Sequence, residues 1–222
     1  MKKIIRKTVL LLLAGTMLFG AAFMENSMPV QAGGAKAKLA IKAYQKFLGQ
    51  SQIEWSGKKY LSSDFQFILA DVNSDGMPEL LLHNQNQTVS HYQGYQAVYY
   101  YSNKKVVQVS VEDSIVEYYP KGGIVTFQHF GMGGSYFYYK VPKNGKKSVS
   151  RVGDVWLLYP NKKLGEKTKY VWYNGEKKTE VSKSKFNSLL KKASGSKNVR
   201  IQSSQWKDNT EANRKKMSKW KK

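Results

Sequence analysis

Residues 95–111, which read YQAVYYYSNKKVVQVSV, hold two strand-forming runs on either side of a short connection. The runs 95–101 and 105–111 are rich in Val and Tyr, which favour a pleated, half-buried surface. The connection, residues 102–104, has the composition of a tight hairpin turn. Strands joined by such a turn pair antiparallel. This stretch therefore predicts an antiparallel hairpin, and its neighbours extend the pattern.

Short strand-like runs continue on both sides of this hairpin, separated by turns rich in Gly, Asn and Lys. They predict further strands at 65–70, 79–83, 115–119, 124–130, 135–141, 149–159 and 169–173. Three more connections have the composition of hairpin turns, namely 121–123, 143–146 and 174–175. No fixed-period repeat occurs, which argues against a propeller or a solenoid.

Apolar residues return at helical spacing at both ends of this strand-rich region. The first helix, 36–48, is ended by Gly49 and collects on one face Leu39, Ala40, Ala43, Tyr44, Phe47 and Leu48. A second helix covers 186–193, with Ser182 or Ser184 as its N-cap, and residues 209–222 predict a short, strongly basic last helix. The expected fold class is α+β, with an N-terminal helix packed on a mostly antiparallel β-meander and short C-terminal helices.

The first 32 residues have the layout of a secretory signal peptide. Residues 1–7 supply four positive charges, residues 8–24 are uncharged and mostly apolar, and small residues stand at Val30 and Ala32. Cleavage after Ala32 would leave 33–222 as a single secreted domain. Its positive charge could associate this domain with the cell wall. The alternative is an uncleaved membrane anchor, because the apolar run is close to the length that spans a bilayer.

Positive charge is concentrated late in the chain. The whole sequence holds 37 Lys and Arg against 15 Asp and Glu, and residues 143–222 alone hold 23 against six. A positive electrostatic field attracts anionic polymers or glycans, and the sequence does not predict a specific nucleic acid as a partner. The alternative is that the lysines serve only solubility. The chain has no cysteine, which excludes disulfides, thiolate zinc sites and Cys nucleophiles.

The segment 71–79, DVNSDGMPE, has the spacing of a calcium loop. A tight loop turns alternate side chains toward one centre, and a glycine at position 6 permits the sharp turn. Met77 would offer its carbonyl oxygen, and Glu79 a carboxylate, directly or through water. The expected Ca²⁺ ligands are therefore Asp71, Asn73, Asp75, Met77 and Glu79. Three carboxylates this close repel one another when no cation is present.

The loop departs from the EF-hand pattern at position 12, where Leu82 replaces the bidentate Glu. Its flanks also look like strands rather than helices. It therefore resembles the strand–loop–strand calcium loops, Asp-x-Asn-x-Asp-Gly-x-x-Asp/Glu, of integrin-type propeller blades, and the related duplicated loops of dockerins. A single copy implies neither whole fold. The alternative is a hairpin turn whose Asp and Asn side chains cap their own backbone.

A broader resemblance extends over most of the chain after residue 32. The segment 43–48 (AYQKFL), the loop at 71–82, the Tyr-rich strand 98–101 and the late Tyr170 to Gly175 hairpin before a helix are similar to those of small, mostly uncharacterised secreted proteins of Gram-positive anaerobes. That resemblance implies secretion and a calcium loop, and it brings no established activity.

Other candidate sites have fewer supporting residues. The histidines of the chain are His83, His91 and His129. His83 and His91, eight residues apart across a polar loop, could contribute to a zinc site, for which the sequence shows no third ligand. The alternative is that the histidines are hydrogen-bonded or solvent-facing. The acids that could supply a glycosidase pair are Glu112, Asp113 and Glu117. No Gly-x-Ser-x-Gly or His-Glu-x-x-His motif occurs.

Two function classes follow from these features. The first is a secreted, non-catalytic calcium-binding protein whose basic C-terminal part binds an anionic cell-wall or host-surface polymer. The second is a secreted, glycosidase-like hydrolase acting on such polymers. The acid-poor composition favours binding, and the sequence leaves the question of enzymatic activity open.

Overall fold

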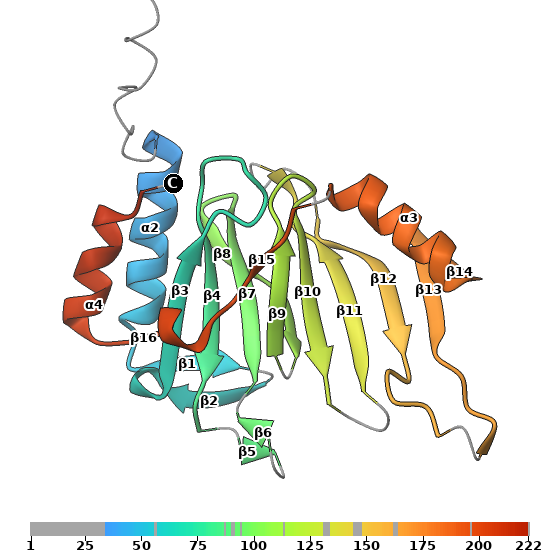
Figure 1. Ribbon diagram of the computed structural model, residues 1–222. Coiled ribbons are helices and arrows are strands. Elements are labelled where there is room, and N and C mark those ends of the chain that lie inside the picture. Colours follow the sequence, from blue (N-terminus) through green and yellow to red (C-terminus); the bar gives the residue numbers. More distant parts are fainter. Residues whose placement is uncertain are drawn as a thin grey trace, which may run out of the picture. The chain divides into compact units, whose positions relative to one another are not determined.

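A computed structural model describes residues 34–221 except 56, 87, 90–91, 94, 113, 131–133, 144–147, 162–163 and 196. The predicted signal peptide, residues 1–32, and most of the predicted turn at 143–146 lie outside the described residues. Residues 33–220 belong to one compact unit. Its architecture is α+β and mostly sheet, as the sequence predicts (Figure 1).

In the described part of the chain, the helices are α2 (Ala35–Leu48), α3 (Lys183–Ser194) and α4 (Glu211–Lys216), with short 3₁₀ turns η1 (Ser62–Asp64), η4 (Ser203–Gln205) and η5 (Met217–Lys219). The strands up to the middle of the chain are β1 (Gln52–Trp55), β2 (Lys58–Leu61), β3 (Phe65–Ala70), β4 (Glu79–Asn84), β5 (Thr88–Val89), β6 (Tyr92–Gln93), β7 (Gln96–Ser102) and β8 (Lys105–Glu112). The later strands are β9 (Ser114–Tyr119), β10 (Ile124–His129), β11 (Ser135–Lys140), β12 (Ser150–Trp156), β13 (Lys169–Asn174), β14 (Lys177–Val181), β15 (Val199–Arg200) and β16 (Lys207–Asp208).

The strands form two larger sheets and two small hairpins. The first sheet has the order β16-β3-β4-β7-β8, and the second has the order β14-β13-β12-β11-β10-β9-β15. β1 pairs with β2, and β5 with β6; every one of these pairings is antiparallel. All nine strands predicted from the sequence are present, and the 102–104 and 174–175 connections are tight hairpin turns. The sequence did not predict the division of the meander into two sheets.

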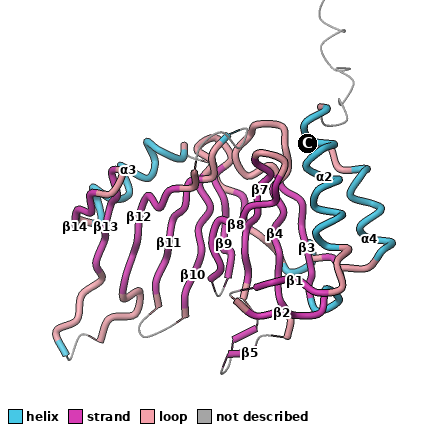
Figure 2. Tube along the Cα trace, turned by 180° about the vertical axis from the view of Figure 1, so that it is seen from behind, coloured by secondary structure: helices cyan, strands magenta, loops and turns pink. Residues whose placement is uncertain are grey.

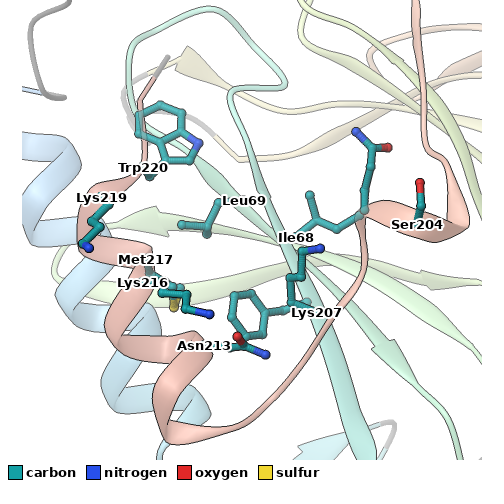
Figure 3. A pocket seen from close by; sticks show the side chains of 11 residues that line it. Ile68, Leu69, Ser204, Lys207, Asn213, Lys216, Met217, Lys219 and Trp220 are labelled. Atoms are coloured by element: carbon teal, nitrogen blue, oxygen red, sulfur yellow. The ribbon is translucent and has the colours of Figure 1, made fainter.

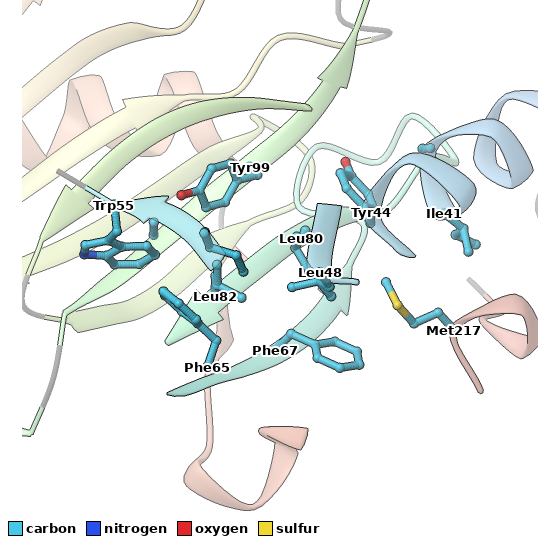
Figure 4. Packing of buried hydrophobic residues seen from close by; sticks show 13 residues of the cluster. Ile41, Tyr44, Leu48, Trp55, Phe65, Phe67, Leu80, Leu82, Tyr99 and Met217 are labelled. Atoms are coloured by element: carbon cyan, nitrogen blue, oxygen red, sulfur yellow. The ribbon is translucent and has the colours of Figure 1, made fainter. Parts of the chain in front are cut away.

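Within the described residues, three apolar clusters hold these layers together. α2 and the β1–β2 hairpin cover one face of the first sheet, where Trp55 packs against Phe65 with ring centroids 5.3 Å apart (Figure 4). The opposite face of that sheet, with Leu81 and Val98, packs on the second sheet around Phe127. α3 then covers the far face of the second sheet and buries the side chains that surround its Phe186. The layer order is therefore helix, sheet, sheet, helix.

The helix ends follow from local chemistry. Gly49 ends α2, as predicted. The Ser182 hydroxyl accepts a hydrogen bond from the Lys185 backbone N–H at 3.2 Å, so Ser182 is the N-cap of α3. Gly195, with φ of 79°, ends that helix, because the left-handed conformation is open to glycine. The predicted basic last helix is present as α4 followed by η5.

The last elements pack on the first ones. α4 lies beside α2 in both views (Figures 1 and 2), and the Gln45 side chain donates a hydrogen bond to the Arg214 carbonyl at 2.8 Å. β16 pairs with β3, and the buried Asn209 amide donates to the Leu48 carbonyl at 3.0 Å. Among the described residues, no helix has the length and apolarity that a membrane span requires.

Candidate metal centre

The loop 71–78 joins β3 to β4. These strands pair from Phe65 with Asn84 to Ala70 with Glu79, so the loop begins and ends at the last rung of the ladder. Its flanks are therefore strands, as the sequence predicts.

Three loop side chains turn their oxygens onto the loop backbone. The Asp71 carboxylate accepts hydrogen bonds from the N–H groups of Asp75 and Gly76, at 3.0 and 3.1 Å. The Asn73 side-chain oxygen also accepts from the Asp75 N–H, at 3.0 Å. Asp75 in turn accepts from the Met77 N–H at 2.8 Å. The structure thus brings Asp71, Asn73 and Asp75 together around one short turn.

Two residues of this turn have left-handed backbones. Ser74 has φ of 55° and Gly76 has φ of 83°. A β-carbon built on Gly76 would meet nothing within 4 Å, so the requirement for glycine there is conformational rather than steric.

Glu79 faces the protein interior. Its side chain is buried, and its two oxygens accept hydrogen bonds from the Val72 N–H and the Asn73 side-chain amide, both at 2.9 Å. Burial raises the pKa of Glu79 well above its usual value, and the negative charges of Asp75 and Asp71 raise it further, while the Val72 hydrogen bond lowers it. Carboxylate charge at this loop is therefore costly without a nearby cation.

The predicted ligands do not all face one point. In the described part of the chain, no three His, Asp or Glu side chains gather closely enough to hold a metal ion. Two carboxylates and one amide turn into the loop, whereas Glu79 binds the other side of Asn73. This set of oxygens is still the type that Ca²⁺ prefers. Glu79 could reach a cation only by exchanging one of its hydrogen bonds or by acting through water.

Remote residues fix the position of the loop. The buried hydroxyl of Tyr44, from α2, donates to the Pro78 carbonyl at 3.0 Å. On the other side, the Asn73 amide donates to the Pro142 carbonyl at 3.2 Å. Gly123 approaches so closely that a β-carbon there would lie 3.0 Å from the β-carbon of Asn73. The spacing of apolar residues places Tyr44 only on the apolar face of its helix, and no local signal in the sequence connects Gly123 or Pro142 to the loop.

The other candidate residues lie elsewhere. The His83 ring packs 5.4 Å from Trp206, and His129 stacks on Phe137 at 6.1 Å. Glu117 accepts hydrogen bonds from the Tyr119 hydroxyl, at 2.7 Å, and from the Asn198 amide. Outside the described residues lie His91, Asp113 and the side chain of Glu112.

A second buried carboxylate, Asp154, has no motif in the sequence that marks it. It accepts from the Arg151 guanidinium at 2.5 Å and from the Tyr173 hydroxyl at 2.6 Å. The guanidinium also lies 4.1 Å from the centre of the Phe137 ring. Burial and the Asp154 hydrogen bond raise the pKa of Tyr173 to about 12. An acid held on both oxygens in this way is typical of a structural ion pair.

Among the described residues, the basic C-terminal part contributes to a larger and a smaller hollow. The larger, of about 790 Å³, lies between β3 and the α4–η5 segment and is lined by Lys207, Lys216 and Lys219 (Figure 3). The smaller, of about 590 Å³, is lined by Lys121, Lys140 and Lys143.

Comparisons of the chain with protein-family models, curated proteins and solved structures find no match.

Proposed function

We propose that this protein is an exported, non-catalytic calcium-binding protein whose basic C-terminal part binds an anionic cell-wall or host-surface polymer. The observation that carries the calcium part is the convergence of Asp71, Asn73 and Asp75 oxygens on one turn, next to a buried carboxylate with a raised pKa. The alternative role of these side chains as simple turn caps explains their backbone contacts. It does not explain a third acid buried beside them.

The side chains of Asp71, Asn73 and Asp75, together with the Met77 carbonyl, would hold the cation. Glu79 keeps the Asn73 amide turned away, so that the Asn73 oxygen stays directed into the turn. Bound calcium would supply the positive charge that offsets carboxylate repulsion and pins β3 to β4. The role of this site is therefore stabilisation of the fold.

The polymer-binding part rests on charge. With 23 basic and six acidic residues between 143 and 222, this surface concentrates anionic chains near the protein. The larger hollow, lined by Lys207, Lys216 and Lys219, gives such a chain a place to bind, which a surface serving solubility alone does not need.

The calcium site is tested by thermal unfolding of residues 33–222 in calcium and in chelator, for wild type, Asp75→Ala and Asp75→Asn. At free calcium about 100 times the Kd, binding stabilises by about 2.7 kcal/mol, which for a chain of this length raises Tm by roughly 5–10 °C. We expect this rise in wild type and its loss in both variants.

Asp75→Asn separates the two readings of the loop. Asparagine keeps an oxygen that accepts the Met77 hydrogen bond but has no charge for a cation. If the loop is only a turn, Asp75→Asn and wild type melt alike in both conditions. Equal wild-type Tm values with calcium and with chelator would remove the calcium assignment.

A further inference from the structure

The groove between β3 and the C-terminal segment combines an apolar floor with lysines and a tryptophan. Ile68 and Leu69 form part of one wall, and Met217 lies on the other (Figure 3). Trp220 stands at one end, where its half-buried ring borders the hollow. At about 790 Å³ the groove has the size of a small-molecule site.

The charge around this groove has one sign. The exposed Lys207 and Lys216 come from opposite sides of it, and Lys219 lies at its outer edge (Figure 3). No acidic side chain lines the groove in the described portion of the chain. An anionic group entering here would meet ammonium donors on both sides, which favours charge-assisted hydrogen bonds.

The apolar surface narrows the choice of ligand. An inorganic anion would leave the indole and the aliphatic wall without a partner. A sugar ring has an apolar C–H face that can pack on an aromatic ring, whose own face is electron-rich. It also has hydroxyls, for which Gln205 and Asn213 supply amide groups at the groove. A sugar that carries a carboxylate or a sulfate would match the wall, the indole and the lysines together.

We propose that this groove binds one acidic sugar unit of the polymer, with its ring on Trp220 and its charged group between Lys207 and Lys216. This inference rests on the proposed polymer binding and names the kind of unit recognised. The carboxylate and the sulfate are the same chemistry for the lysines, and defined oligosaccharides distinguish them.

The test is titration calorimetry of residues 33–222 with three hexasaccharides: one from heparin, its desulfated form and uncharged maltohexaose. Wild type should bind the heparin hexasaccharide, whereas maltohexaose should not bind. Binding of the desulfated form would assign the charged group as a carboxylate, and its failure to bind would assign a sulfate. Inorganic sulfate at the same concentration of charge should bind far more weakly.

Matched variants locate the site. Lys207→Gln with Lys216→Gln should lower heparin hexasaccharide affinity about tenfold or more. The control, Lys140→Gln with Lys143→Gln, removes the same charge from the smaller hollow and should change the affinity by less than about twofold. Trp220→Leu keeps an apolar side chain and should lower affinity about threefold to tenfold, without changing the salt dependence.

Several results would overturn the inference. Equal losses in the two lysine pairs would mean diffuse attraction, and a larger loss in the control pair would move the site to the smaller hollow. Binding of maltohexaose, or sulfate binding as tight as that of the hexasaccharide, would contradict an acidic sugar. Should Trp220→Leu fail to fold, the lysine pairs still decide, because all four side chains are exposed. If wild type binds no anionic polymer even at low salt, the proposed function fails. If wild type binds and the groove variants bind with the same affinity as wild type, the proposed function stands and this inference fails.

Discussion

Glu79 connects the loop to the interior through its bonds to Val72 and Asn73. Because its pKa is higher in the folded chain than in the unfolded one, its contribution to stability is full below the unfolded pKa. That contribution is lost as pH rises through the folded pKa. Metal-free wild type should therefore lose stability with rising pH, by at most about 1.4 kcal/mol per pH unit from this group.

Glu79→Gln should flatten that dependence, since glutamine does not titrate. Urea unfolding of metal-free protein from pH 4 upward measures both slopes. Calcium should restore the free energy of unfolding of wild type at neutral pH, and it should raise that of Glu79→Gln by a smaller amount. Superimposable pH profiles would show that Glu79 does not titrate differently on unfolding.

Gly76→Ala tests the left-handed turn. With φ of 83°, alanine should cost about 1–2 kcal/mol in urea unfolding without any clash. Gly57→Ala is the matched control, because Gly57 also has positive φ and open space around it. Both should destabilise alike in chelator, while Gly76→Ala alone weakens calcium binding by calorimetry. Unchanged calcium affinity in Gly76→Ala would contradict a cation held by this turn.

Residue spacing alone could predict that Asp71, Asn73 and Asp75 meet, because position in a tight loop decides which side chains face inward. The direction of Glu79 could not be predicted in the same way. It follows from Asn73, whose amide is fixed by Pro142 in a distant connection.

At the scale of elements, α2 holds the loop through one buried hydroxyl. Tyr44→Phe would leave the Pro78 carbonyl without that donor and should cost about 1–3 kcal/mol in urea unfolding. Tyr99→Phe removes the same atom from a partly buried bond to Gln108, and should cost about 0.5–1.5 kcal/mol. Only Tyr44→Phe should also lower calcium affinity. An equal effect of both variants on calcium would mean that α2 does not position the loop.

The strands that the sequence predicts are those with apolar alternation or Tyr-rich runs. β1 was missed because it is only four residues long, whereas β2 and β14 are short and also rich in exposed, charged residues. β14 reads KKTEV and forms an edge of the second sheet. Charged residues on an edge strand prevent it from pairing with other chains. The same residues remove the apolar alternation by which a strand is predicted from sequence. The division into two sheets was missed because β7 is buried on both faces. Side-chain alternation does not indicate which element packs on each face.

At the scale of the whole molecule, the basic C-terminal part should make polymer binding depend on salt. Exposed charges are screened beyond roughly 10 Å at 0.1 M salt, so affinity for a long anionic polymer should fall steeply as salt increases. Calorimetry across a salt series measures this. An affinity that does not change with salt, or no binding at low salt, would leave residues 143–222 as a solubilising surface.

Because the first and last elements contact each other, the fold can be completed only after the C-terminal residues have been synthesised. α2 leaves the ribosome early, yet its cluster includes Met217, and β3 gains its outer partner only from β16. At about 5–20 residues per second, roughly 10–40 s pass between these two ends. Through that interval the chain has an open sheet edge and an uncovered apolar face. A nascent chain stalled after residue 206 should therefore stay sensitive to protease, and one released at 222 should become resistant.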